Sequence, residues 1–327
     1  MIRLAVIGTG VMGSHHVRIL KQMTNVDLVS ISDTDKDKLD KLSSQYNIKK
    51  IYVNHLEMLE KEKLDGVVVA VPPSYHKKIV LDCFKKGLNV LVEKPIAHSV
   101  EDAKEMIKAA DMAGTIFTVG HVERFNPVVT KIKEFIDQGM IGKIYLVNSV
   151  RIGPFPKRLY GMVEGVLIDL AVHDVDIIRY LSNDITQVVS QLIFSGKQEI
   201  YAQALFNIKG NIKGSSAFSW VSPKKMREIE VLGMKGTLRG DYINQELRFY
   251  ENSDDTDYAI RDGKISEGKM IKFPIWKQEP LKVELEHFVE CIEKRKQPLV
   301  EPLDALKALE VALAIYESGI SDKSIKL

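Results

Sequence analysis

The stretch Gly8-Thr9-Gly10-Val11-Met12-Gly13 directly follows the apolar run Leu4–Ile7 and leads into an amphipathic segment. In a strand-to-helix turn of this kind, the first glycine permits the tight turn and the second lets a pyrophosphate approach the backbone. The third allows the helix to pack closely on the strand. The helix N-terminus then offers free N–H groups and a positive dipole end to phosphates. The pattern predicts a dinucleotide-binding turn at Gly8, Gly10, Val11, Met12 and Gly13.

An acidic residue lies at the position that distinguishes NAD from NADP in domains with such a turn. Asp33 follows the apolar run Leu28–Ile31 and lies 20 residues after Gly13, where a carboxylate can bind both hydroxyls of a ribose. Thr34 comes next and no arginine stands beside Asp33. Because the 2′-phosphate of NADP would meet the carboxylate, the sequence favours NAD over NADP.

The alternation of apolar runs and amphipathic segments continues beyond this turn. Further runs, apolar on both faces, are Gly66–Val71, Asn89–Val92 and Ile116–Val119. This pattern is typical of parallel strands that helices cover on both sides. Residues 1–120 are therefore predicted to form a doubly wound α/β domain, the Rossmann arrangement.

The carboxyl ends of these strands should line one crevice, because ligands of such domains bind beyond them. They carry Pro72-Pro73-Ser74-Tyr75-His76, then Glu93-Lys94-Pro95, then Gly120-His121. At such a place Lys94 can hold a substrate hydroxyl, but a solvated surface lysine is the usual fate of this residue type. Its position alone leaves both interpretations open.

Residues 121–327 show a different pattern, with many alternating segments between short turns. It predicts an α+β domain with a mostly antiparallel sheet and helices on one side. The expected strands are Lys143–Ile152, Gln187–Phe194, Ile200–Ile208, Lys213–Trp220, Arg227–Leu232, Gly236–Asp241 and Glu246–Tyr250. The expected helices are Pro127–Asp137, about Val166 to Leu181, Lys282–Lys296 and Leu303–Ser318.

One of these helices carries candidate chemistry. Asp169 and His173 are four residues apart in the helix from Val166 to Leu181, so they share a face. A carboxylate–histidine pair can act as an acid/base unit. Spacing alone favours a solvated helix pair instead. No companion cluster of cysteines and histidines points to zinc, so no metal site is expected.

Composition excludes several classes of protein. The chain has 327 residues and a formal net charge of +2, which argues against a nucleic-acid binder. No apolar run approaches the roughly 20 residues that span a bilayer. Cys83 and Cys291 cannot form a disulfide framework, which favours a reducing compartment. We therefore expect a two-domain cytoplasmic protein without nucleic-acid or membrane partners.

Taken together, the motifs resemble the glucose–fructose oxidoreductase/inositol dehydrogenase/rhizopine catabolism (Gfo/Idh/MocA) family of NAD(P)-dependent sugar oxidoreductases. The resemblance covers nearly the whole chain, in order. It implies a Rossmann domain followed by a domain with a large open sheet, which commonly forms a dimer or tetramer interface. The matching stretches are the glycine-rich turn, Glu93-Lys94-Pro95, Gly120–Pro127, Ile141–Ile144 and Asp169–His173.

The resemblance also implies roles for individual residues. Lys94 would contact the reacting hydroxyl, and the Lys94–Pro95 peptide is often cis. Asp169 and His173 would complete the catalytic site, with His173 as the general base. The residues implied to lie beside the cofactor are Pro72, His76, Glu93, Lys94 and Asn126. His76 and His121 could equally be structural.

Three stretches are more specific and resemble UDP-N-acetylglucosamine 3-dehydrogenases: Gly120–Pro127, Arg151–Arg158 and Ile168–Asp176. They contain cations that suit a diphosphate, although Lys157 and Arg158 could simply form a solvated loop. The predicted substrate-binding set is Lys94, Arg124, Arg151, Arg158, Asp169 and His173.

The leading hypothesis is therefore an NAD-dependent dehydrogenase that oxidises C3 of UDP-N-acetylglucosamine. A polyol or inositol dehydrogenase is the alternative. A non-catalytic NAD-sensing regulator is disfavoured by the presence of Lys94, Asp169 and His173 together. One departure from many relatives is that a single glycine, Gly165, remains just before the helix of Asp169.

Overall fold

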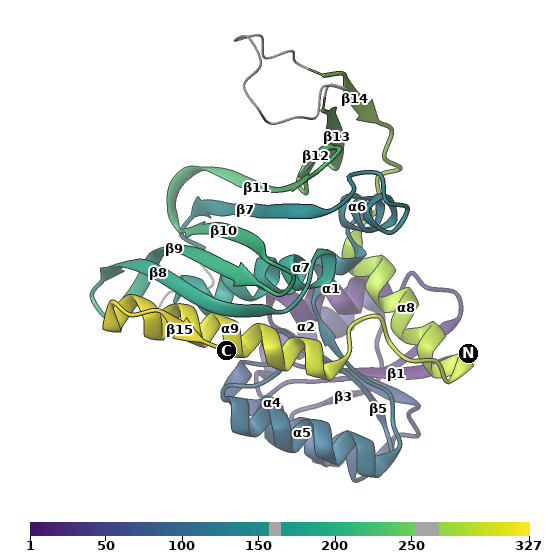
Figure 1. Cartoon of the computed structure of the whole chain (residues 1–327). Coiled ribbons are helices and arrows are strands. Elements are labelled where there is room, and N and C mark those ends of the chain that lie inside the picture. Colours follow the sequence, from purple (N-terminus) through teal and green to yellow (C-terminus); the bar gives the residue numbers. More distant parts are fainter. Residues whose placement is uncertain (157–164, 253–267) are drawn as a thin grey trace, which may run out of the picture. The chain divides into compact units, whose positions relative to one another are not determined.

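The computed structural model describes residues 1–156, 165–252 and 268–327 (Figure 1), which divide into two compact units. Unit 1 comprises Met1–Val122 and Glu279–Leu309, and unit 2 comprises Glu123–Gln278 and Glu310–Leu327. The predicted boundary after residue 120 lies close to the first division. The predicted extent of the second domain needs correction, however, because 279–309 belongs to unit 1.

Unit 1 contains a six-stranded parallel sheet in the order β3-β2-β1-β4-β5-β6. The order reverses at β1, so the doubly wound Rossmann prediction is confirmed. The strands are β1 (Ile2–Ile7), β2 (Val26–Ser32), β3 (Ile51–Tyr52), β4 (Gly66–Val69), β5 (Asn89–Glu93) and β6 (Phe117–Gly120). Its helices are α1 (Val11–Leu20), α2 (Lys36–Tyr46), α3 (His55–Lys61), η1 (Pro73–Tyr75), α4 (His76–Phe84) and α5 (Val100–Ala113).

The helix α8 (Pro280–Lys294) completes the core of unit 1. Its apolar residues Leu281, Leu285 and Phe288 are buried in one cluster with residues of β1 and α1. Burial of this apolar stripe against the Rossmann sheet is the physical reason why the segment does not belong to the second domain.

Unit 2 contains a nine-stranded sheet in the order β14-β13-β12-β11-β7-β10-β9-β8-β15. Its pairs are antiparallel except for β10 and β7. The predicted, mostly antiparallel sheet is confirmed. The strands are β7 (Ile144–Pro154), β8 (Ile185–Ser195), β9 (Gln198–Ile208), β10 (Ile212–Ser219), β11 (Val221–Gly233), β12 (Gly236–Asp241), β13 (Glu246–Glu251), β14 (Met270–Phe273) and β15 (Ile325–Lys326).

Helices contribute to the core of unit 2 from one side of this sheet. They are α6 (Pro127–Asp137), the π-helical turn η4 (Leu167–Ala171), α7 (Val172–Leu181) and the C-terminal part of α9 (Pro302–Ser321). Val128, Val175 and Ile315 from three of them are buried with the inward residues of the strands. A short 3₁₀ turn, η2 (Val122–Phe125), stands where the chain passes from unit 1 to unit 2.

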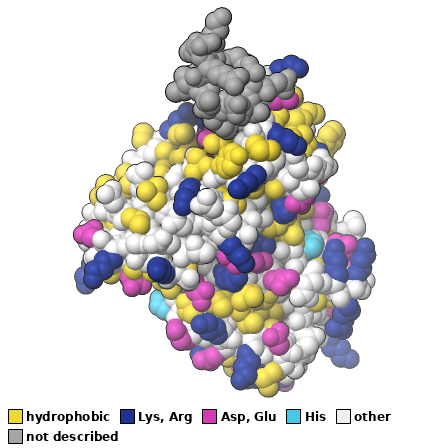
Figure 2. Space-filling model, viewed as in Figure 1, with side chains coloured by type: hydrophobic (Ala, Val, Ile, Leu, Met, Phe, Trp, Pro, Cys, Tyr) yellow, Lys and Arg dark blue, Asp and Glu magenta, His cyan; other side chains and the backbone are white. Residues whose placement is uncertain are grey.

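The molecular surface carries charges of both signs. In the face that Figure 2 displays, Lys and Arg side chains are interspersed with Asp and Glu, and hydrophobic side chains lie between them. Among the helices that the structure describes, none combines the length and the apolar character needed to cross a membrane.

Candidate functional site

The glycine-rich turn has the shape that a pyrophosphate requires. Gly8 has φ +92°, and a Cβ at this position would lie 2.4 Å from the Ala70 carbonyl oxygen. At Gly13 a Cβ would lie 1.9 Å from the Gly8 oxygen. Gly10, in contrast, has no described atom within 4 Å of an added Cβ. The turn is therefore closely packed on the protein side and open at Gly10, so its residues fit a bound dinucleotide.

Asp33 lies against this turn. Its Oδ2 accepts hydrogen bonds from the Thr9 backbone N–H at 2.6 Å and from the Thr9 hydroxyl at 2.8 Å. Its Oδ1 accepts from the Asp35 N–H at 2.9 Å. These contacts hold the carboxylate at the end of β2, where it can meet a ribose. The role of Asp33 in selecting NAD stays a prediction.

Lys94 follows β5 directly, and the Lys94–Pro95 peptide is cis, as the resemblance implied. Glu93 is buried, with Oε1 2.7 Å from His16 Nε2. Its Oε2 accepts from the Lys94 backbone N–H at 3.2 Å. Burial raises the pKa of Glu93, but the hydrogen bond from His16 and the charge of Lys94 outweigh it and leave the pKa lowered. This placement argues against the predicted contact between the Glu93 side chain and the cofactor.

His76 takes the structural alternative. The ring is fully buried, with Nδ1 3.0 Å from the Pro95 oxygen and Nε2 2.9 Å from the Val71 oxygen. Burial lowers the pKa of His76 despite these acceptors. The imidazole therefore ties the segment after β4 to the segment after β5, while Pro72 nearby is exposed. His121 is also buried, at the end of β6.

In unit 2, Asp169 and His173 lie on one continuous helix, as predicted. Its first turn is not α-helical: Asp169 belongs to η4, a turn of π-helix, and His173 to the first turn of α7. Such π turns are rare and are frequent at functional sites. The Asp169 side chain is buried and His173 is half-buried.

A buried glutamate explains the single glycine before this helix. A Cβ on Gly165 would lie 1.8 Å from Cδ of Glu199, a residue of β9. Glu199 Oε1 accepts from the Leu167 backbone N–H at 3.3 Å, and burial raises the pKa of Glu199. The carboxyl of Glu199 thus occupies the space beside Gly165 and binds a free N–H of the π turn. The sequence analysis did not identify this residue.

Arg124 and Asn126, two predicted ligand contacts in unit 2, both have partners within the protein. Arg124 is 3% exposed, and its Nε and Nη2 donate to the two carboxylate oxygens of Asp176 at 2.8 and 2.6 Å. Asn126 caps α6, because its Oδ1 accepts from the Val128 N–H at 3.1 Å. The buried guanidinium of Arg124 requires a carboxylate partner such as Asp176. These contacts argue against binding of the diphosphate by Arg124 and of the cofactor by Asn126.

Arg151 is buried in a charge network. Its Nη1 donates to Glu123 Oε1 and its Nε to Asp174 Oδ1, both at 2.9 Å. Burial alone would lower the pKa of Arg151, but the two carboxylates outweigh it and raise it. Arg227, on β11, adds a longer contact of 3.5 Å to Glu123. Burial and the neighbouring charge of Arg151 lower the pKa of Arg227.

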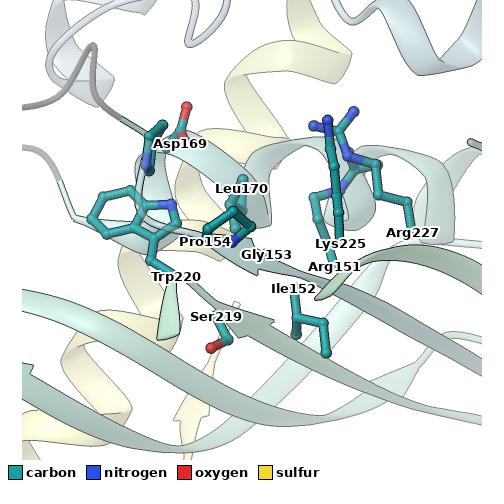
Figure 3. A pocket seen from close by; sticks show the side chains of 11 residues that line it. Arg151, Ile152, Gly153, Pro154, Asp169, Leu170, Ser219, Trp220, Lys225 and Arg227 are labelled. Atoms are coloured by element: carbon teal, nitrogen blue, oxygen red, sulfur yellow. The ribbon is translucent and has the colours of Figure 1, made fainter. Parts of the chain in front are cut away.

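Arg151 and Arg227 border a pocket of about 140 Å³ within unit 2. In Figure 3, Arg151, Lys225 and Arg227 gather at one side of the pocket, and Asp169 and Trp220 lie at the other. The remaining lining residues are Ile152, Gly153, Pro154, Pro156, Leu170 and Ser219. Of the predicted substrate-binding set, the pocket brings together Arg151 and Asp169. Arg158, with its neighbour Lys157, lies outside the described residues.

Sequence reasoning missed Trp220, Lys225 and Arg227. Trp220 ends the predicted strand Lys213–Trp220, and Arg227 begins the next one. In the predicted pattern both therefore lie at strand ends, the same kind of position that yields the candidates of the first domain. The Trp220 ring packs edge-on against Phe155, with centroids 5.1 Å apart. Its Nε1 is buried without a hydrogen-bond partner among the described residues.

Comparison with known proteins agrees with this architecture. A model of the oxidoreductase family with the NAD-binding Rossmann fold, GFO_IDH_MocA, matches residues 2–121, and the C-terminal domain model of the same family matches residues 129–239. A curated relative, scyllo-inositol 2-dehydrogenase (NAD(+)) of Bacillus subtilis, is 29% identical over 100% of this chain and 96% of its own length.

Two solved structures share the fold. UDP-N-acetylglucosamine 3-dehydrogenase GnnA from Acidithiobacillus ferrooxidans has a TM-score of 0.86 and 20% identity, covering 97% of each chain. The WlbA dehydrogenase from Bordetella pertussis, in complex with NADH and UDP-GlcNAcA, has a TM-score of 0.82 and 23% identity. The match covers 100% of this chain and 98% of that one.

The two family models together match more than half of the chain, one in each unit. The chain therefore belongs to the Gfo/Idh/MocA family of oxidoreductases, as the sequence motifs indicated. It is an NAD-dependent dehydrogenase of the class that acts on CH–OH groups, and its cofactor domain is the NAD-binding Rossmann domain of unit 1.

Proposed function

We propose that the chain oxidises a hydroxyl of a nucleotide sugar to a ketone, and that its substrate is UDP-N-acetylglucosamine, oxidised at C3. The pocket of unit 2 carries this proposal, because Lys225 and Arg227 line it, and Asp169 is the one acid among its described lining residues. Arg151 also lines the pocket, but Glu123 and Asp174 already balance its charge. Cations suit a diphosphate. An uncharged polyol would instead need polar groups that match its hydroxyls.

The proposed chemistry assigns one task to each catalytic side chain. His173 takes the proton of the reacting hydroxyl while the C–H bond of the carbon that bears this hydroxyl breaks. Lys94 stabilises the negative charge that develops on the oxygen. Asp169, on the same helix, orients the imidazole of His173 or stabilises its protonated form. NAD, when bound at the glycine-rich turn, supplies a nicotinamide C4 that accepts the hydride, so the alcohol loses a hydride and a proton to become a ketone.

The names of similar proteins support this substrate and also suggest a competing one. GnnA is named a UDP-N-acetylglucosamine 3-dehydrogenase, whereas the curated relative from Bacillus subtilis is named an inositol dehydrogenase. Inositol or another polyol is therefore the second candidate substrate. The cationic side chains of Lys225 and Arg227 at the pocket favour the nucleotide sugar.

Incubation of the protein with NAD and a panel of sugars separates the candidates. We expect NADH to form with UDP-N-acetylglucosamine and not with inositol, glucose or free N-acetylglucosamine. Arg227→Gln should raise KM for the nucleotide sugar by roughly tenfold or more, because a hydrogen bond to a charged group contributes about 1.5–3 kcal/mol. Arg239→Gln, which alters an exposed arginine of β12, is the matched control. Formation of NADH with inositol but not with UDP-N-acetylglucosamine would overturn the proposal.

We also propose that two copies of the chain associate through the sheet of unit 2. The face opposite its helices exposes Val189, Ile193 and Leu205 by 47%, 56% and 57%. Val189 and Leu205 are partners across β8 and β9. Exposed apolar side chains that share one sheet face are typical of an interaction surface.

We also propose a reducing, cytoplasmic setting for the protein, because Cys83 and Cys291 are free cysteines.

A further inference from the structure

A carboxyl group in the core of unit 1 is not used by the proposed chemistry. Glu284 lies on the buried face of α8, next to Leu281, Leu285 and Phe288, and is 2% exposed. Neither of its side-chain oxygens has a hydrogen-bond partner in the described part of the chain. An ionised carboxylate in such surroundings is strongly disfavoured, because it loses its hydration and gains no partner.

The charged group that acts on Glu284 is another carboxylate. Burial raises the pKa of Glu284 well above its usual range, and the charge of Glu93 raises it further. Glu93 has the opposite tendency, because His16 on α1 and Lys94 at the end of β5 stabilise its ionised form. Of the two carboxyls, Glu284 is therefore the one whose surroundings favour the protonated form, and Glu93 is the one whose partners favour the ionised form.

We propose that Glu284, as a neutral acid, is a positioning residue for Lys94. With Glu284 uncharged, Glu93 remains the single buried carboxylate of the pair and keeps its two contacts. One contact is with His16 of α1, the helix that begins at the glycine-rich turn, at 2.7 Å. The other is with the backbone N–H of Lys94 at 3.2 Å. Glu93 thereby links the cofactor turn to the proposed catalytic lysine, and the inference rests on that proposed role.

Ionisation of Glu284 would bring two like charges together in a medium of low dielectric constant. Repulsion would then move Glu93 away from its two donors and displace Lys94. The folded protein also holds this proton at pH values where the unfolded chain has lost it. Stability should therefore fall as the pH rises above about 4.3, the ordinary value for glutamate, towards the raised pKa of Glu284.

The test compares the full-length wild type with Glu284→Gln, which keeps the shape of a neutral acid and cannot ionise. The control is Glu286→Gln, an exposed position of the same helix. We expect kcat at neutral pH and the Kd for NAD to change less than twofold. The loss of kcat at alkaline pH should move up by one pH unit or more in Glu284→Gln only. Identical kcat profiles for all three proteins would overturn the inference.

Infrared spectroscopy of the wild type keeps the inference testable if Glu284→Gln does not fold. We expect the carbonyl stretch of a buried, protonated glutamic acid at pH 7 in protein labelled with 13C at its glutamate carboxyls. The same band should persist in Glu199→Gln, which removes another buried glutamate with a raised pKa, and absence of the band would overturn the inference. A Lys94→Ala enzyme distinguishes the two proposals. If that enzyme turns over normally, the catalytic role of Lys94 fails, and with it the positioning role. A protonated Glu284 in the infrared spectrum would then remain as a structural property only.

Discussion

Lys94 and His173 come from different units of the chain, and neither belongs to the glycine-rich turn. Lys94→Ala and His173→Ala should each lower kcat by roughly 100- to 10,000-fold, the usual contribution of a positioned acid or base. The Kd for NAD should stay within about twofold, because the open turn at Gly10 is unchanged. Steady-state NADH absorbance and a cofactor titration measure the two quantities.

The control for this pair is His98→Ala, which removes an exposed histidine. A His173→Ala enzyme with a nearly normal rate would exclude His173 as the general base. Loss of NAD binding in either variant would mean that the residue supports the cofactor domain rather than the chemistry.

Trp220 offers a second test at the level of one side chain. Buried indole N–H groups usually have a hydrogen-bond partner, and the nitrogen of Trp220 lies at the pocket (Figure 3). We expect it to donate to a substrate oxygen. Trp220→Phe should then raise KM for the sugar by roughly 3- to 10-fold, which corresponds to about 0.5–1.5 kcal/mol for a neutral hydrogen bond.

Trp276 provides the matched control, because it is 87% exposed and Trp276→Phe removes the same group from the surface. Substrate titration of the intrinsic fluorescence and steady-state kinetics give the two affinities. An unchanged KM in Trp220→Phe would show that the indole nitrogen does not contact the sugar.

Charged residues show where sequence reasoning reaches its limit at this scale. The sequence places Arg124 and Arg151 in stretches that resemble UDP-N-acetylglucosamine 3-dehydrogenases, where cations suit a diphosphate. Their partners, Asp176 and Asp174, lie on α7 and are distant in the sequence. Only the folded chain shows that these guanidinium groups are buried and already paired. The exposure of a cation depends on tertiary neighbours that no local pattern encodes.

Local signals predicted whole elements more successfully than their boundaries. Ser99 stands three residues before Asp102, a spacing typical of a helix N-cap, and its side chain accepts from the Asp102 N–H at 3.1 Å at the start of α5. The two-residue strand β3 was missed because it is too short to show periodicity. The π turn η4 was also missed, since its residues have an ordinary helical pattern. The packing of α8 depends on which apolar surface is available, which the helix sequence alone does not specify.

The contact between Gly165 and Glu199 leads to a prediction for η4. Gly165→Ala would force the Glu199 carboxyl to move and break its bond to the Leu167 N–H. Overpacking of this kind typically costs about 1–3 kcal/mol. We expect a lower Tm and a lower kcat, because the start of the helix that carries Asp169 shifts.

The double variant Gly165→Ala/Glu199→Ala separates crowding from other effects of the substitution. Removal of the carboxyl makes room for the added methyl group, so part of the lost kcat should return relative to Gly165→Ala alone. Thermal unfolding and steady-state kinetics on the four proteins of this cycle provide the coupling energy. Purely additive losses would contradict a direct contact between the two positions.

For the whole molecule, the exposed sheet face of unit 2 predicts self-association. A twofold axis would place the same patch of each copy against the other. Leu205 belongs to this patch and lies between Val189 and Ser215 on the two neighbouring strands. Sedimentation velocity should show the wild type as a dimer or tetramer. Leu205→Lys places a charge in the buried interface and should shift the protein to the monomer, with the Tm of the monomeric fold as a check that it remains folded.

A charge added elsewhere should have no such effect. Val53→Lys alters a side chain of unit 1 that is 52% exposed and lies outside the sheet of unit 2. Because it changes the net charge by the same amount, it controls for general electrostatic repulsion. Equal sedimentation of the wild type and both variants would exclude the sheet face as the interface. Dissociation of Val53→Lys alone would place the interface on unit 1 instead.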